Sequence, residues 1–97
     1  MADAFDIVYA PEAVEDIRGL RAFDRTAVLR AVEQNLLVEP MRESRSRIKR
    51  MIQPFWSQFR LRSGDFRVYY DVDESTHAVQ VLRVLSKGTS QTPAENP

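Results

Sequence analysis

The sequence predicts an α+β fold in which a small, mostly antiparallel sheet of about four strands packs against a hairpin of two helices. One run with strand periodicity and two runs with apolar residues at helical spacing lie between residues 5 and 39. Three further runs between residues 55 and 85 alternate apolar and polar residues or are rich in valine and leucine. The 97 residues are expected to form one domain over 1–88 and a flexible tail over 89–97.

A short strand and a helix are predicted at the start of the chain. The odd positions of 5–9 are apolar, which is the period-two pattern of a strand. Pro11 suits the first position of a helix that runs to about Leu20, because its fixed φ fits the helix and its missing N–H would be unpaired there. The apolar stripe of this helix contains Val14, Ile17 and Leu20.

A second helix is predicted to begin with Asp24 as its N-cap residue. Phe23 and Val28 flank this position at the spacing of a hydrophobic staple, in which two side chains pack together across the first turn. Pro40 requires the helix to end by about Val38, because the residue before a proline avoids helical geometry. The buried stripe is expected to contain Val28, Leu29, Val32, Leu36 and Leu37.

The middle of the chain is irregular and basic. Residues 41–54 have no apolar period, so a basic loop or a short turn of helix ending at Pro54 is expected there. Residues 42–70 hold eight basic and two acidic residues, whereas residues 1–41 hold four basic and eight acidic ones. A formal net charge of zero therefore conceals a strongly positive segment.

Three strands are predicted after this segment. Residues 55–62 and 66–72 alternate apolar and polar positions, and Gly64-Asp65 between them is the signal of a two-residue hairpin turn. Residues 78–85 carry valine and leucine on both faces, which predicts a central strand covered on both sides.

The predicted hairpin gathers basic and aromatic side chains on the face away from the helices. With a two-residue turn, Arg62 lies opposite Arg67. Arg60 lies opposite Tyr69 in the same register. Like charges directly across a ladder are destabilising, so an anion is expected among these arginines; an acidic protein partner and a solvated charged face are the alternatives. The face is expected to present Arg60, Arg62, Arg67, Tyr69 and Trp56, with Lys49, Arg50 and Lys87 extending it.

Several kinds of chemistry are excluded by what the chain lacks. It has no cysteine and one histidine, His77, in an expected turn, so neither a thiolate nucleophile nor a metal site is predicted. Its three glycines are isolated and form no phosphate-binding loop, and no cofactor is expected. Catalysis would have to use Arg, Lys or Tyr, and attack of an RNA 2′-OH on the adjacent phosphate is the reaction most compatible with them.

The chain carries no sign of export or membrane insertion. No stretch approaches the roughly 20 apolar residues of a membrane helix. The N-terminus lacks the basic and apolar regions of a secretory signal, and the absence of cysteine fits a reducing compartment. We therefore expect a cytoplasmic protein with no membrane partner.

The order of these elements resembles the RelE/ParE superfamily of bacterial type II toxin–antitoxin toxins. The matching segments are A-P-E-A at 10–13, R-L-R-S-G-D-F-R-V-Y-Y at 60–70 and V-L-R-V-L at 81–85. The resemblance covers about residues 5–88, and the hairpin is its most specific part. The short first helix resembles the RelE branch more than the ParE branch.

The resemblance implies a cognate antitoxin that wraps the toxin, and a target that is either mRNA on the ribosome, as for RelE, or DNA gyrase, as for ParE. Arg67 matches the hairpin arginine that RelE-type toxins use on the phosphate. Arg60 matches a basic position on the preceding strand, and Lys87 falls near the basic residue after the last strand. These three are the expected catalytic residues, and the expected RNA-binding residues are Lys49, Arg50, Arg62, Tyr69 and Trp56.

The leading expectation is a RelE-like, ribosome-dependent mRNA endoribonuclease that works by 2′-OH transesterification on an arginine-lined sheet face. Gln58 stands where a RelE-type enzyme has another lysine, and no tyrosine or histidine follows Lys87. These departures leave two alternatives. One is a ParE-like gyrase inhibitor without nuclease activity, and the other is a non-catalytic toxin that only binds its antitoxin.

Overall fold

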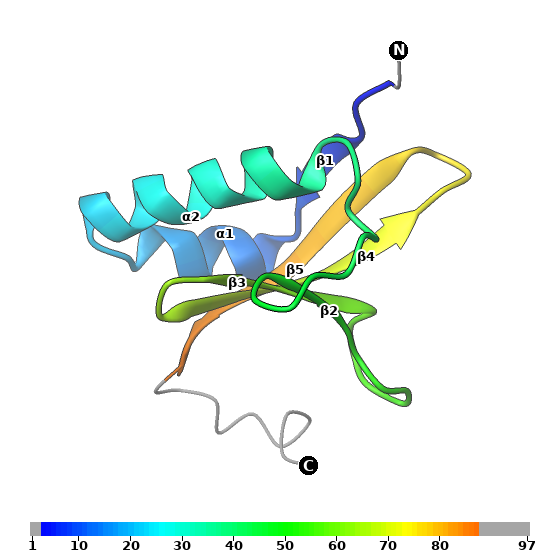
Figure 1. Cartoon of the computed structure of the whole chain (residues 1–97). Coiled ribbons are helices and arrows are strands. Elements are labelled where there is room, and N and C mark those ends of the chain that lie inside the picture. The colour runs from blue at the N-terminus through cyan, green and yellow to red at the C-terminus, as the bar shows by residue number, and fades with distance from the viewer. Residues whose placement is uncertain (1–2, 88–97) are drawn as a thin grey trace.

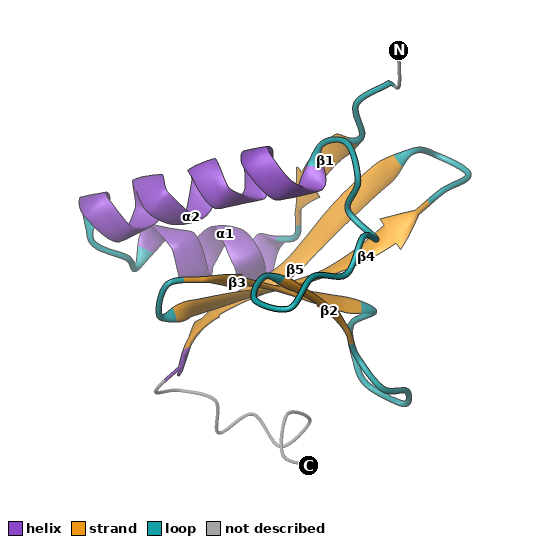
Figure 2. Ribbon diagram, viewed as in Figure 1, coloured by secondary structure: helices purple, strands orange, loops and turns teal. Residues whose placement is uncertain are grey.

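The computed structural model describes residues 3–87. The strands are β1 (Asp6–Tyr9), β2 (Ile48–Arg50), β3 (Phe59–Ser63), β4 (Phe66–Asp73) and β5 (Ala78–Ser86), and the helices are α1 (Pro11–Arg18) and α2 (Ala22–Leu36). Both helices lie on one face of a single sheet with the strand order β1-β5-β4-β3-β2 (Figure 1, Figure 2). β1 is parallel to β5, and the other neighbouring strands are antiparallel. The predicted α+β fold is confirmed, with five strands in place of about four.

The hydrophobic core lies between the helices and the inner face of the sheet, which is the face that the helices cover. Tyr70 on β4 is fully buried there, and its ring stacks on Phe59 with 5.5 Å between the centroids. Its hydroxyl donates a hydrogen bond of 2.6 Å to the backbone oxygen of Pro40, and burial raises the pKa of this hydroxyl. Tyr70 thereby fastens the segment that follows α2 to the middle of the sheet.

α1 begins at Pro11, as predicted, and Asp16 near its end ties it to β5. The Asp16 carboxylate accepts hydrogen bonds from Arg83 Nε (2.7 Å), from Arg83 Nη2 (3.0 Å) and from the backbone N–H of Val84 (2.9 Å). These hydrogen bonds raise the pKa of Arg83. β1 pairs with β5 only as far as Val81, so Asp16 supplies a partner to the strand edge beyond that residue.

α2 begins at Ala22, and the prediction of Asp24 as its N-cap is wrong. Arg21 occupies the N-cap position and makes no side-chain capping hydrogen bond. Phe23 is 83 % exposed, so it does not form the expected staple with the buried Val28.

Arg25 supplies the physical reason for the different start. Its guanidinium donates hydrogen bonds to the backbone oxygens of Leu20 (2.9 Å) and Ile17 (3.4 Å). These carbonyls lie in the last turn of α1 and just beyond it, so one side chain joins the two helices. The buried residues of α2 are Val28, Ala31, Val32 and Leu36, and Leu29 and Leu37 are half-buried.

Part of the predicted basic loop over 41–54 is a strand. β2 pairs with β3 as an edge strand, and Ile48 lies opposite Leu61 with 5 % of its surface exposed. A strand of three residues is too short to show a period in the sequence, so pairing with β3 is what forms it.

β3 begins at Phe59, so the first half of the predicted strand over 55–62 is wrong. Residues 51–58 instead form a loop that projects from the sheet on the side away from the helices (Figure 1). The loop closes on itself through a hydrogen bond of 2.8 Å from the backbone N–H of Met51 to the oxygen of Gln58. Phe55 and Trp56 belong to this loop, so the alternation of the sheet does not govern where they point.

β5 lies between β1 and β4, which confirms the predicted central position. It is not covered on both sides, because Gln80 is exposed on the outer face of the sheet, which no helix covers. The register with β4 shifts between Tyr69 and Tyr70, which pair with Arg83 and Val81 and leave Leu82 without an opposite residue. Neither helix of the described chain is long and apolar enough to cross a membrane.

Candidate anion-binding site

The β3–β4 hairpin has the predicted turn and register. Its two-residue turn forms, and Gly64 takes up a φ of 57°, a conformation that glycine adopts without strain. Arg62 lies opposite Arg67, and Arg60 lies opposite Tyr69. The residues that alternate with them are buried on the inner face, so these four side chains belong to the outer face.

A pocket of about 360 Å³ opens where the hairpin turns, and we call it the cationic pocket. Two backbone hydrogen bonds bring three segments together around it. The N–H of Arg62 donates to the oxygen of Arg47 over 2.8 Å, and the N–H of Lys87 donates to the oxygen of Asp65 over 2.6 Å. The pocket is lined by Ser46, Arg47, Arg62, Gly64, Asp65, Arg67 and Lys87.

A smaller hollow of about 90 Å³ extends the basic surface toward β2. It shares Arg47 and Arg62 with the cationic pocket and adds Arg45, Lys49 and Arg60. Guanidinium groups present paired N–H donors that match the oxygens of a phosphate. A bound anion would also relieve the repulsion between arginines that face each other across the ladder.

The structure brings most of the predicted basic residues together. Arg62, Arg67 and Lys87 line the cationic pocket, and Lys49 and Arg60 lie opposite each other beside it. Arg50 is the exception, and the prediction that it extends this patch is wrong. Its guanidinium carbon lies 4.6 Å from the ring centroid of Phe59, in a cation–π contact on the inner face.

Tyr69 does not offer its ring to a ligand, so the prediction that it is displayed is wrong. The residue is fully buried, with the ring centroid of Trp56 at 4.7 Å and that of Phe55 at 5.9 Å. Both covering residues come from the second half of the loop over 51–58, which the sequence assigned to a strand beginning at Phe55. Trp56 is half-buried and is the predicted aromatic residue that still reaches the outer surface.

Arg47 was missed as a site residue. It lies in the charged run over 42–50, where no apolar period indicates which side chains point together. Its position in the pocket depends on the backbone hydrogen bond to Arg62, which forms only when β2 has paired with β3. The one signal in the sequence that could have indicated Arg47 as a site residue is the high density of arginines in this run.

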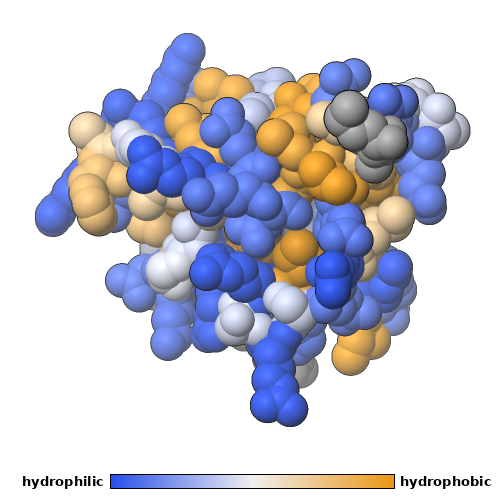
Figure 3. Space-filling model, turned by 45° about the horizontal axis from the view of Figure 1, so that its top comes forward, coloured by the Kyte–Doolittle hydropathy of each residue, from blue (hydrophilic) through white to orange (hydrophobic). Residues whose placement is uncertain are grey.

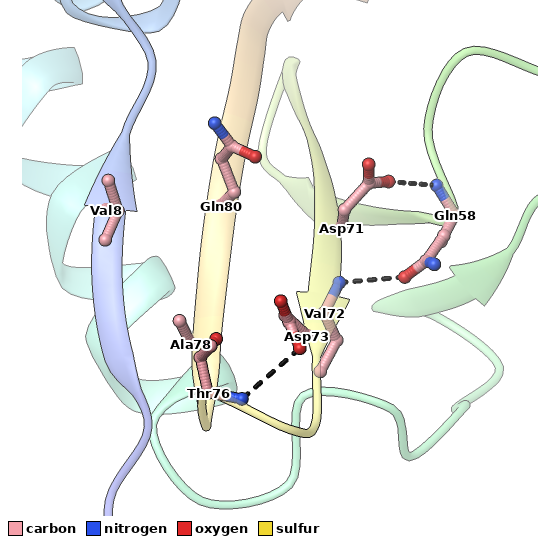
Figure 4. Close-up of a pocket in the computed structure, with 8 residues that line it drawn as sticks. All are labelled: Val8, Gln58, Asp71, Val72, Asp73, Thr76, Ala78 and Gln80. Atoms are coloured by element: carbon pink, nitrogen blue, oxygen red, sulfur yellow. Dashed lines mark hydrogen bonds between the residues drawn. The ribbon is translucent and has the colours of Figure 1, made fainter.

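A second hollow, of about 430 Å³, lies toward the other end of β4, and we call it the acidic hollow (Figure 4). No Arg, Lys or His lines it. The carboxylate of Asp71 accepts a hydrogen bond of 2.7 Å from the backbone N–H of Gln58, whose side-chain oxygen accepts one of 2.8 Å from the N–H of Val72 (Figure 4). The lining residues are Val8, Gln58, Asp71, Val72, Asp73, Thr76, Ala78 and Gln80.

The carboxylate of Asp73 also has partners within the chain. It accepts hydrogen bonds from the hydroxyl (2.7 Å) and N–H (3.0 Å) of Ser75 and from the N–H of Thr76 (3.3 Å). These bonds, of which that from the Ser75 hydroxyl has the largest effect, lower the pKa of Asp73. Two carboxylates without a cation disfavour a phosphate in this hollow.

The single histidine lines neither pocket. His77 lies in the expected turn, where its ring stacks on Phe5 with 3.8 Å between the centroids. Within residues 3–87, no group of three or more His, Cys, Asp or Glu side chains is placed to hold a metal ion.

Comparison with protein families gives one match. The family model described as "ParE toxin of type II toxin-antitoxin system, parDE" matches residues 7–90. No curated protein sequence matches the chain.

Several solved structures share the fold. The toxin–antitoxin complex RelBE2 from Mycobacterium tuberculosis contains a chain with a TM-score of 0.75 and 24 % identity, and the match covers 86 % of this chain and 98 % of that one. The archaeal RelE–RelB complex from Pyrococcus horikoshii OT3 gives 0.70 and 18 %, covering 89 % and 98 %. A mutant of the E. coli toxin RelE in the free state gives 0.68 and 20 %, covering 95 % and 93 %. At these identities the likeness shows the fold alone.

Proposed function

The chain belongs to the ParE toxin family of type II toxin–antitoxin systems, and from this premise we propose that it acts on mRNA at the ribosome, with the cationic pocket holding the phosphate that is attacked. The observation that supports the proposal is the composition of that pocket. Four basic residues from three separate segments line it together with one acidic residue. Such a site is suited to a polyanion, because each guanidinium or ammonium group can neutralise one phosphate.

The chemistry proposed for the pocket is attack of a 2′-OH on the adjacent phosphate of the same RNA strand. Arg62 and Arg67 would hold the non-bridging oxygens and stabilise the extra negative charge of the transition state. Holding the phosphate and the 2′-oxygen in line would add the effect of orientation. This reaction needs neither a metal ion nor a cofactor.

We also propose that a cognate antitoxin binds this toxin. Three of the structures that share its fold are toxin–antitoxin complexes of the RelB–RelE type. On the side that the helices occupy, hydrophobic residues are exposed among mostly hydrophilic ones (Figure 3). Among the exposed large hydrophobic residues are Phe23 at the start of α2 and Val38 just after it, and an antitoxin that packs along α2 would cover both.

A second candidate function is inhibition of DNA gyrase without RNA cleavage. The observation that favours it is the family match itself, since the matching model is that of ParE toxins over residues 7–90. The pocket also lacks a histidine and a tyrosine. For this function the basic surface would bind an acidic protein surface or gyrase-bound DNA.

One pair of assays distinguishes the two functions. Purified protein is added to ribosomes that carry a defined mRNA, with reverse transcription to locate cleavage, and in parallel to gyrase in a supercoiling assay. We expect cleavage on the ribosome that Arg67→Ala abolishes, and no effect on supercoiling. Arg18→Ala is the matched control, because Arg18 lies on α1, is exposed and pairs only with Glu15. Loss of supercoiling without RNA cleavage would establish the second function and overturn the first.

A further inference from the structure

We propose that Asp65 is the general base of this toxin and that Lys87 is its general acid. The proposal rests on the RNA-cleaving function put forward above and assigns its two proton-transfer steps. The sequence alone indicates no catalytic role for Asp65, because the residue stands in a turn, where aspartate is common for conformational reasons.

The position of Asp65 is defined by the hairpin turn. It follows Gly64, and it lines the cationic pocket together with Arg62 and Arg67 on the two strands. Its backbone oxygen accepts the 2.6 Å hydrogen bond from the N–H of Lys87. This main-chain hydrogen bond therefore places the proposed acid and the proposed base next to each other at the wall of the same pocket.

Among the described residues that line the pocket, Asp65 is the one suited to accept a proton at neutral pH. Arginine does not lose its proton in proteins, so Arg47, Arg62 and Arg67 act as hydrogen-bond donors only. Lys87 carries an ammonium group, which donates. The hydroxyl of Ser46 is too weak a base without a partner to activate it. A carboxylate is a recognised general base and is the remaining choice.

Other proton acceptors of the described chain do not line this pocket. Glu43 lines the adjoining smaller hollow, where its carboxylate accepts a hydrogen bond of 3.3 Å from the N–H of Arg50. His77 stacks on Phe5 and does not line the pocket. The carboxylates of Asp71 and Asp73 line the acidic hollow and accept backbone hydrogen bonds there. Asp16 is held by Arg83 and Val84 at the edge of β5.

The proposed step balances without a cofactor. Asp65 takes the proton of the 2′-OH as the 2′-oxygen forms a bond to phosphorus. The bond from phosphorus to the 5′-oxygen of the next nucleotide breaks, and that oxygen takes a proton from the Lys87 ammonium. The products are a 2′,3′-cyclic phosphate and a 5′-OH, and water then returns a proton to Lys87 and removes the one on Asp65. No group is oxidised or reduced.

The decisive variant is Asp65→Asn, which keeps the shape of the side chain and a residue type that suits the turn. We expect ribosome-dependent cleavage to fall by about 10²–10⁴-fold, the usual contribution of a general base. Binding of a non-cleavable RNA whose attacking ribose is 2′-deoxy should stay the same or become tighter, because a negative charge leaves the pocket. Asp71→Asn, the same change in the acidic hollow, should leave cleavage unchanged.

Two further measurements separate catalysis from structure. Asp65→Glu should restore part of the activity and the acid limb of the pH–rate profile, which Asp65→Asn should lose. A substrate with sulfur in place of the 5′-oxygen needs no proton on its leaving group, so it should rescue Lys87→Ala but not Asp65→Asn.

The outcomes distinguish this inference from the proposed function on which it rests. Cleavage by the wild type together with an Asp65→Asn rate within threefold overturns the assignment of Asp65 and leaves the proposed function standing. Failure of the sulfur substrate to rescue Lys87→Ala overturns the assignment of Lys87. Absence of cleavage by the wild type on ribosomes overturns the proposed function and this inference together.

Discussion

The cationic pocket and the acidic hollow lie toward opposite ends of the same strand. Arg67, near the start of β4, lines the first, and Asp71 and Asp73 near its end line the second. Arg67 and Asp71 are four residues apart, or about 13 Å along a strand, and their side chains share the outer face. Their volumes, about 360 and 430 Å³, are similar, so size does not distinguish them.

The difference lies in what the charged groups do within the fold. In the acidic hollow the carboxylates accept hydrogen bonds from the loop over 51–58 and from the β4–β5 turn. In the cationic pocket backbone hydrogen bonds join the segments, and the lining residues include four basic ones and one acidic one, so positive charge is in excess. Charged groups that form hydrogen bonds to a loop indicate a structural role. An excess of charge of one sign in a pocket indicates a ligand of the opposite sign.

The largest effect expected from this difference between the two regions is on binding to RNA. Arg62→Ala with Arg67→Ala should weaken binding by about tenfold for each arginine, since a charge-assisted hydrogen bond is worth about 1.5–3 kcal/mol. The slope of log affinity against log salt should fall by about 0.7 for each lost contact with single-stranded RNA. The measurement is fluorescence anisotropy with a labelled single-stranded RNA at several salt concentrations.

The matched control for that pair is Asp71→Asn with Asp73→Asn. It should change RNA affinity by less than about threefold, because an exposed charge about 13 Å away is screened at 0.1 M salt. Equal effects of the two double variants would contradict the distinction between the two regions and indicate that only net charge matters.

A smaller effect is expected on stability at the turn that shapes the cationic pocket. Gly64→Ala should lower the free energy of unfolding by about 1–2 kcal/mol, because the φ of 57° is unfavourable for a residue with a Cβ. No atom lies within 4 Å of the added Cβ, so packing contributes nothing to the loss. The measurement is urea denaturation followed by circular dichroism.

Gly19→Ala at the end of α1 is the control for this backbone effect. Its φ is −77°, and the nearest atom to an added Cβ is the backbone oxygen of Asp16 at 3.6 Å, an ordinary contact. This variant should be as stable as the wild type or more stable by up to about 1 kcal/mol. A loss equal to that of Gly64→Ala would show that the conformation of Gly64 is not the cause.

The smallest expected effect concerns the titration of Asp73 in the acidic hollow. Hydrogen bonds from Ser75 and Thr76 lower its pKa, so Ser75→Ala should move that pKa back toward the ordinary value. A folded-state pKa below that of the unfolded chain gives stability that is present above about pH 3.9 and is lost as the pH falls through the folded value. Carbon-13 NMR of the Asp73 carboxyl measures the shift, and an unchanged pKa in the variant would contradict the stated cause.

Much of the fold could be predicted because its signals are local. Pro11 at the start of α1, the Gly64 turn and the alternation along β4 each act within a few residues, and the structure has all three. The same alternation correctly placed Arg60, Arg62 and Arg67 on one face. Such predictions succeed where the backbone geometry is repetitive.

The failures occur where a distant contact overrides the local pattern. Phe55 and Trp56 alternate like strand residues but fold over Tyr69, since burying three rings together outweighs two more strand pairs. β2 exists because β3 offers it a partner, and this pairing turns Arg50 to the inner face. Asp24 is not the N-cap residue of α2, because Arg25 joins the ends of the two helices and the helix begins earlier, at Ala22.

By itself, the sequence determined the fold class, the hairpin register and the sign of the charge that the hairpin displays on the outer face of the sheet. Only the tertiary structure decided that Arg47 and Asp65 join Arg62, Arg67 and Lys87 in one pocket. The physical reason is the distance along the chain over which each kind of interaction acts. Periodicity and turn residues act over a few positions, whereas the pocket depends on main-chain hydrogen bonds between segments that are far apart along the chain.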